Sequence, residues 1–451
     1  MSLSGLFEIS KRSLTTYQKA LEVTSNNIAN ANDPYYSRRT ITFGTVDSNA
    51  RVGMSIGLGV KIEEINRVRD QLSDTQTIKY NQSYSSAGKQ SAILSNVEAL
   101  FGEPDNGLSS MLTDFFNSWD ELAVTPNSVP LRTDVVQSAE KVSEKIQNLY
   151  EGLNLVKNDL KSDGESLVNE MNSYIKQIQN YNKQIYDANV NGDPGYSLLD
   201  KRNEALQNLS QLANINVSYD DKNMASVSIG GVFAIDKVQA IQFKSTIENG
   251  KFAVYTEDGN AKVTLTGGEL HGISNTYNKL IPDYVSQLDE VANQIFESVN
   301  NIHSTGYSNT DPQQTGINFF ESYSNGVLKI NRDIVDDPNL IAISADGTTG
   351  NGDIATLIAD LRDTKMSNGY SISENYSNFV SDVANAIVEN DQKAEANQLV
   401  LQQLDEQQAA YSGVNIDEEM TNIINFQRSY DASAKLISIA DELLQTIIDM
   451  V

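Results

Sequence analysis

The residue types that most often carry catalysis or bind metals are scarce in this chain of 451 residues. It has no cysteine and two histidines, His271 and His303, which stand 32 positions apart. Thiolate chemistry, disulfides and Cys-based metal sites are therefore excluded, and neither histidine belongs to a Ser-His-Asp or HExxH arrangement. We interpret both histidines as surface or helix-packing residues, and we expect neither catalytic residues nor a cofactor.

Acidic clusters are the remaining candidates for metal binding, and the clearest lie at Asp220-Asp221, Asp336-Asp337 and 417–419. An EF-hand loop needs oxygen ligands at fixed offsets and a closing glutamate, whereas the twelfth position counted from Asp346 is Leu357. We therefore expect no metal site and interpret these acids as solvated surface. Acids in a first helical turn favour the positive end of the helix dipole, so residues 417–419 predict a helix start.

Composition narrows the classes of partner. The formal net charge of −27 argues against nucleic acid and against anionic membranes, because phosphate binding needs a basic face. No apolar run approaches the roughly 20 residues that span a bilayer. Lys11 and Arg12 lie where a signal peptide would be apolar, so a cleavable export signal is not expected. The length is typical of roughly three domains.

Apolar residues recur with alternating spacings of four and three at both ends of the chain. This spacing places them along one seam of a helix, as in a coiled coil. Residues 1–40 carry five Lys/Arg against three Asp/Glu, whereas 412–451 carry two against seven, so the two ends are weakly complementary in charge. We predict that these seams form an assembly interface, made of Leu3, Phe7, Leu14, Tyr17, Leu21, Ile28, Ile416, Met420, Ile423, Tyr430, Ile437, Leu444 and Ile448.

Between the ends, narrow apolar seams on polar segments predict long helices near 86–101, 130–190, 277–303 and 371–411. Residues 217–219, 227–229, 252–254 and 263–265 alternate as strands do. Asn249-Gly250 and Asp258-Gly259 are favourable pairs for type I′ turns. Trp119 lies among apolar residues at helical spacing, which predicts a core position.

The predicted fold is mainly α, an elongated helical bundle formed by both halves of the chain, with coiled-coil-like terminal helices and a small inserted β domain. The terminal assembly domain would comprise residues 1–60 and 412–451. The body would comprise 61–215 and 268–411, with an irregular segment near 304–352. The inserted β domain would comprise 216–267.

Two segments carry a family resemblance. The stretch from Ser25 to Pro34, followed by Tyr36-Ser37-Arg38-Arg39, resembles the N-terminal signature of flagellar rod, hook and hook-associated proteins. The run 412–420, continued by 426–435, resembles their C-terminal signature. Tyr35 stands where the family usually has glycine, which predicts a different turn after the first helix if that glycine needs positive φ.

Interior phrases resemble the hook-associated protein 1 (FlgK) family in particular, namely Gly107 to Ser118, Leu198 to Arg202, Leu209 to Leu212 and Gly267 to Leu270. The resemblance implies a structural subunit at the hook–filament junction that assembles into a ring or tubular layer. It implies contacts with the hook protein and with a second junction protein, type III export without a cleavable signal, a cytoplasmic chaperone on the C-terminal helix, and an extracellular location in the flagellum. The alternatives are another axial protein, a hook or distal rod subunit, or an exported hydrolase.

Overall fold

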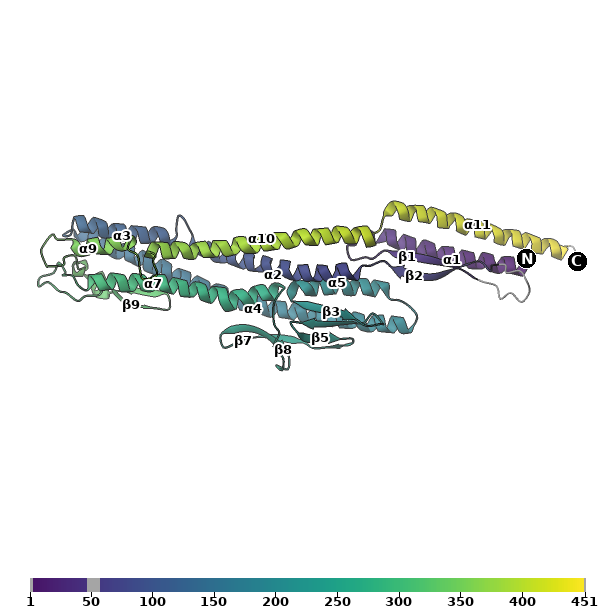
Figure 1. The fold of residues 1–451 in the computed structure, drawn as a ribbon, viewed down its shortest axis with the longest axis horizontal. Helices are drawn as coiled ribbons and strands as arrows, with labels where there is room; N and C mark the ends of the chain where they lie inside the picture. Colours follow the sequence, from purple (N-terminus) through teal and green to yellow (C-terminus); the bar gives the residue numbers. More distant parts are fainter. Residues whose placement is uncertain (1–2, 47–56, 450–451) are drawn as a thin grey trace.

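The computed structural model describes residues 3–46 and 57–449, and shows an elongated molecule with both chain ends at the same tip (Figure 1). At this tip, helix α1 (Leu3–Ala29) lies beside helix α11 (Ile416–Asp449), and strands β1 (Arg39–Thr45) and β2 (Val60–Arg67) form an antiparallel hairpin next to α1. After α1 ends at Ala29, Pro34 disfavours a helical conformation of Asp33, so the helix does not resume there. Residues 47–56, which join the two strands, lie outside the described ranges.

Long helices build the body, and three of them begin at a residue whose side chain caps the first turn. Asp70 caps α2 (Gln71–Phe101), and Ser128 with the following Pro130 starts α4 (Val129–Val190). Ser371 and Glu374 form a reciprocal capping box on α10 (Ile372–Ser412), which runs along α2. The remaining body helices are α3 (Leu108–Val124), α5 (Tyr196–Leu212), α6 (Glu269–Asn275), a π-helical turn (Thr276–Leu280) and α7 (Ile281–His303).

Six short strands lie on one flank of the body, where α4 packs against them (Figure 1). A four-stranded antiparallel sheet has the order β3-β4-β5-β6, and β7 pairs with β8 in a separate hairpin. Asn249 and Gly250 both have positive φ, as a type I′ turn requires. The strands are β3 (Ile215–Tyr219), β4 (Ala225–Ile229), β5 (Val232–Asp236), β6 (Gln239–Ala240), β7 (Phe243–Glu248) and β8 (Lys251–Thr256).

An aromatic core closes the tip of the molecule opposite the chain ends. Trp119 of α3 contacts Phe319 edge-to-face, with ring centroids 5.3 Å apart, and both side chains are fully buried. Arg132 is also buried, and its guanidinium donates hydrogen bonds of 2.8 Å to the carbonyls of Pro126 and Ile341. The surrounding elements are β9 (Phe320–Ser324), β10 (Val327–Ile330), α8 (Arg332–Asp336), α9 (Asp353–Ala359) and two 3₁₀ turns, 338–340 and 360–362.

The predicted mainly α, elongated fold with a small β region is confirmed, and Trp119 is a core residue as expected. Two local predictions were wrong. Residues 263–265 form no strand. The one β contact in this segment is an isolated bridge between the preceding Lys262 and Tyr255. Asp258 lacks positive φ, and the loop closes instead through a 2.9 Å bond from the Thr256 N–H to the Ala261 carbonyl. The β1–β2 hairpin was not predicted. Separately, no helix in the described ranges is long and apolar enough to span a bilayer.

The buried His303 should make stability depend on pH. Burial lowers its pKa from 6.5 to about 4, so the folded protein keeps it neutral while the unfolded chain takes up a proton. The stability that the neutral His303 contributes to the folded state is fully present above pH 6.5 and is lost as the pH falls towards 4. Between pH 7 and pH 5 we expect it to remove about 2 kcal/mol from the free energy of unfolding.

Urea unfolding of the wild type and of His303→Gln at both pH values checks this, because the glutamine does not titrate. The free energy of the wild type should fall by about 2 kcal/mol more than that of the variant. Equal falls in the two proteins would contradict the assignment of a neutral buried histidine.

Candidate assembly surface

Three elements meet in an aromatic cluster at the tip that carries both chain ends. Tyr17 of α1, Phe43 of β1 and Phe426 of α11 lie with ring centroids 5.6 to 6.4 Å apart. Aromatic pairs at this separation stabilise beyond the area they bury. On α11 the side chains buried against the rest of the tip are small or polar, namely Ser433 and Ala440 further along the helix. Small residues let two helices approach closely, so α1 and α11 pair along much of their length.

A buried polar hub ties the start of α11 to the end of α1. The Glu419 carboxylate accepts a hydrogen bond of 3.1 Å from the Asn27 Nδ2 amide and one of 2.8 Å from Arg38 Nε. Asn27 also exchanges two bonds with the Arg39 backbone, and its Oδ1 accepts a bond of 2.8 Å from the Tyr36 hydroxyl. A buried carboxylate must be paired and hydrogen-bonded, and here the partners come from the other end of the sequence. The two family-like signatures therefore contact each other directly.

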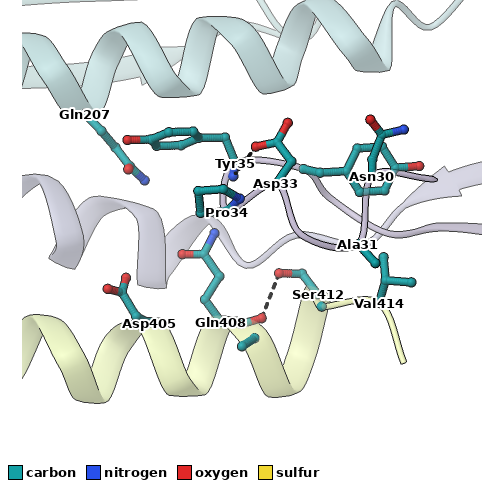
Figure 2. Close-up of a pocket in the computed structure, with 13 residues that line it drawn as sticks. Asn30, Ala31, Asp33, Pro34, Tyr35, Gln207, Asp405, Gln408, Ser412 and Val414 are labelled. Carbon is teal, nitrogen blue, oxygen red and sulfur yellow. Dashed lines mark hydrogen bonds between the residues drawn. The ribbon is translucent and has the colours of Figure 1, made fainter. Parts of the chain in front are cut away.

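The loop after α1, residues 30–36, lies next to this hub and inserts between helices α5 and α10 of the body. Figure 2 shows the Tyr35 ring pointing toward Gln207 of α5, with Asp405 and Gln408 of α10 on the other side of a cavity of about 370 Å³. Burial is the main cause of the raised pKa of Tyr35, and the nearby Glu204 and Asp405 carboxylates add to it. The φ of Tyr35 is not positive, so a bulky residue is unstrained here, and a turn that differs from that of relatives with glycine stays a prediction.

The second attachment of the terminal hairpin uses Asp200, which lies in the phrase Leu198 to Arg202. Arg67 of β2 donates to Asp200 at 2.8 Å, and Arg39 approaches the same carboxylate at 3.8 Å. Arg202 turns the other way and donates to Asn182 Oδ1 at 3.0 Å, while its guanidinium lies 5.1 Å from the Tyr219 ring of β3. This short phrase thus links the tip, the body helices and the β region.

Although α11 is paired with α1, much of its apolar surface faces outward. Nine large apolar side chains are exposed on its 34 residues, against four on the 62 residues of α4. Their exposed fractions run from 40% for Leu436 and Leu444 to 68% for Ile448. Exposed apolar side chains concentrated on one helix favour an interaction site there. The nine are Ile416, Met420, Ile424, Leu436, Ile439, Leu443, Leu444, Ile447 and Ile448.

The thirteen predicted interface residues divide into two groups, and none is fully buried. The exposed group is Phe7, Ile416, Met420, Leu444 and Ile448. The half-buried group is Leu3, Leu14, Tyr17, Leu21, Ile28, Ile423, Tyr430 and Ile437. The spacing did not identify the exposed row Leu436, Ile439, Leu443 and Ile447, which lies on a different face of α11. Counting the apolar residues on every face of α11, and not only along one seam, could have identified this row.

The two histidines and Asp346 make hydrogen bonds that fix local structure. His303 accepts a 2.9 Å bond from the Ala342 N–H and lies 2.8 Å from the Ile317 carbonyl, and His271 Nδ1 lies 2.7 Å from the Ser86 hydroxyl. Both are helix-packing residues. Asp346 accepts bonds from its own loop, at Ser344, Thr348 and Asn351. Within residues 3–46 and 57–449, no group of three or more His, Asp or Glu side chains could hold a metal ion.

The hub offers a matched pair of substitutions, because Glu418 and Glu419 both lie within 2.9 Å of Arg38 Nη2. The side chain of Glu419 is 3% exposed and that of Glu418 is 57% exposed. Breaking a buried ion pair typically costs about 3–5 kcal/mol, and breaking an exposed one about 0–1 kcal/mol. We expect Glu419→Gln to speed amide exchange over the first turns of α11 by at least tenfold, and Glu418→Gln to change it little. Equal effects of the two would contradict a buried hub.

Three family models match the sequence. A model of the flagellar hook-associated protein FlgK helical domain covers residues 94–320. A model of the C-terminal region of the flagellar basal body rod proteins FlgEFG covers 406–450, and a model of the flagella basal body rod protein covers 8–34. The two terminal matches include α11 and most of α1, the helices that the hub joins.

Relatives match along almost the whole chain. Flagellar hook-associated protein 1 of Bacillus subtilis is 28% identical, with 98% of this chain and 97% of the relative covered. The Escherichia coli protein of the same name is 20% identical, with 99% and 100% covered. The fold resembles the flagellar hook junction protein FlgK from Burkholderia pseudomallei, with a TM-score of 0.65 at 14% identity over 75% of this chain and 100% of that one. Because the helical-domain model alone spans 227 of the 451 residues, this chain belongs to the flagellar hook-associated protein 1 (FlgK) family.

Proposed function

We propose that this protein is a structural, non-catalytic subunit of the junction between the flagellar hook and filament, where it assembles with further copies of itself through α1 and α11. The observation that carries this proposal is the exposed apolar surface of α11, which lies on the tip formed by the two chain ends. Membership of the family places the chain in the flagellum, among other axial components.

The energy available from this surface suits a durable assembly. Fully burying a Leu or Ile side chain stabilises by about 1.5–3 kcal/mol before ordering costs are subtracted. The nine exposed side chains of α11 are already about half buried in the free subunit. The free energy gained by burying the rest of each one therefore lies at or below the lower end of that range. Even so, one copy can contribute several kcal/mol at each contact, and a closed ring repeats that contact.

We propose that residues 1–60 and 412–451 act as the assembly domain, with the thirteen seam residues and the exposed row on α11 contacting neighbours. The body, 61–215 and 268–411, and the β insertion, 216–267, would face outward. In this arrangement the half-buried seam residues hold α1 and α11 together within one copy. The exposed residues then contact the next copy.

We further propose that the hook protein binds one side of the layer and a second junction protein the other. Export would use the flagellar type III route without a cleavable signal, and a cytoplasmic chaperone would shield α11 before export. The apolar surface of α11 supports the chaperone, since an uncovered surface of this kind promotes aggregation at cytoplasmic concentrations. A hook or distal rod subunit is the nearest alternative, and the match of the helical domain over 94–320 favours the junction.

Substituting the exposed row tests the proposal. We expect Leu443→Asp with Ile447→Asp to abolish incorporation into the junction, because each buried carboxylate would lack a partner. The melting temperature of the free subunit should barely change, since both side chains are about half exposed. Complementation of motility in a deletion strain and calorimetry of the purified variant measure the two effects.

The matched control is Leu155→Asp with Val190→Asp on α4, two apolar residues that are more exposed than the test pair. These changes add the same charge to the body and should leave motility intact. Normal incorporation of the α11 variant, or equal loss in both variants, would refute the role of α11.

A further inference from the structure

Where the terminal hairpin meets the body, a second cavity of about 230 Å³ is lined by three arginines, Arg67, Arg69 and Arg202, and by one acid, Asp74. The volume is far more than one water molecule needs. The lining therefore carries an excess of two positive charges in a chain whose net charge is −27. A cluster of positive charge is unexpected in a protein whose net charge is strongly negative, and it suggests a bound negative partner.

The acids near the cavity do not neutralise all three arginines. Asp74 forms a two-pronged pair with Arg69, with nitrogen–oxygen distances from 2.7 to 3.0 Å. Arg67 pairs with Asp200, whose other oxygen already faces Arg39. Arg202 has no carboxylate within ion-pair distance in the described part of the chain. Its hydrogen bonds go to neutral oxygens, Asn182 Oδ1 and the Asn223 carbonyl.

Two guanidinium nitrogens of the arginines that line the cavity are buried and have no hydrogen-bond partner among the described residues, Arg67 Nη2 and Arg202 Nε. Arg202 is 2% exposed, so water from the bulk does not solvate it freely. Burial lowers the pKa of Arg202 to about 10, and the positive charge of Arg67 acts in the same direction. Arginine nevertheless stays protonated at neutral pH, so an unpaired buried guanidinium is costly.

We propose that this cavity binds a small tetrahedral oxyanion of the phosphate or sulfate class. Such an ion accepts several hydrogen bonds at once, and guanidinium groups match its oxygens well. Bound there, it would neutralise the excess charge and join β2 and the start of α2 to α5 and the β3–β4 turn. The ion would thus fasten the assembly tip and the β insertion to the same point of the body.

Phosphate at millimolar concentration and constant ionic strength tests this on the full-length free subunit. The melting temperature should rise and saturate with phosphate and with sulfate, but not with chloride or acetate. Saturation separates binding from the general stabilising effect of these salts, which grows steadily with concentration. No rise beyond that in chloride would overturn the proposal.

Gln71 lines the same cavity at the first position of α2, where an acid is favoured by the helix dipole. The variant Gln71→Glu supplies a carboxylate in place of the ion and should be more stable than the wild type without phosphate. Its apparent affinity for phosphate should fall by at least tenfold. Gln76→Glu adds the same charge to an exposed position of α2 outside the cavity, and should keep the wild-type response. Equal phosphate responses in both variants would overturn the site.

Discussion

The contact between Glu419 and the pair Asn27 and Arg38 fixes the two ends of this chain against each other. A carboxylate that is removed from water must keep its partners, and these partners lie nearly 400 positions earlier in the sequence. Once they are joined, α11 has to start beside the end of α1 and run back along it toward the tip. The cluster of Tyr17, Phe43 and Phe426 then holds the two helices and the hairpin together.

This pairing decides which apolar residues remain for other copies. The fully buried apolar side chain of α11 is the small Ala440, whereas nine large apolar side chains of the same helix stay exposed. The same tip is attached to the body through Asp200, which receives arginines from both strands of the hairpin. The tip is therefore held to the body helices by these ion pairs and by the inserted loop around Tyr35.

Much of this architecture could be predicted from the sequence because it follows local rules. The helix period identified the longest helices, the Asn249-Gly250 pair identified a turn of the β region, and the acids at 417–419 marked the start of α11. The β1–β2 hairpin was missed since its strands are half exposed and lack clean alternation. The exposed row on α11 and the pairing of Glu419 with Arg38 depend on how two distant helices meet, which periodicity within one helix does not encode.

The exposed row on α11 should become buried when copies assemble. Because the chain has no cysteine, a single Leu443→Cys or Leu155→Cys substitution provides a unique thiol on α11 or on the body. Modification by a water-soluble thiol reagent can then be timed in the free subunit and in purified hook–filament junctions. Assembly should strongly slow modification at position 443 and leave modification at position 155 unchanged. Unchanged reactivity at position 443 in the junction would contradict it.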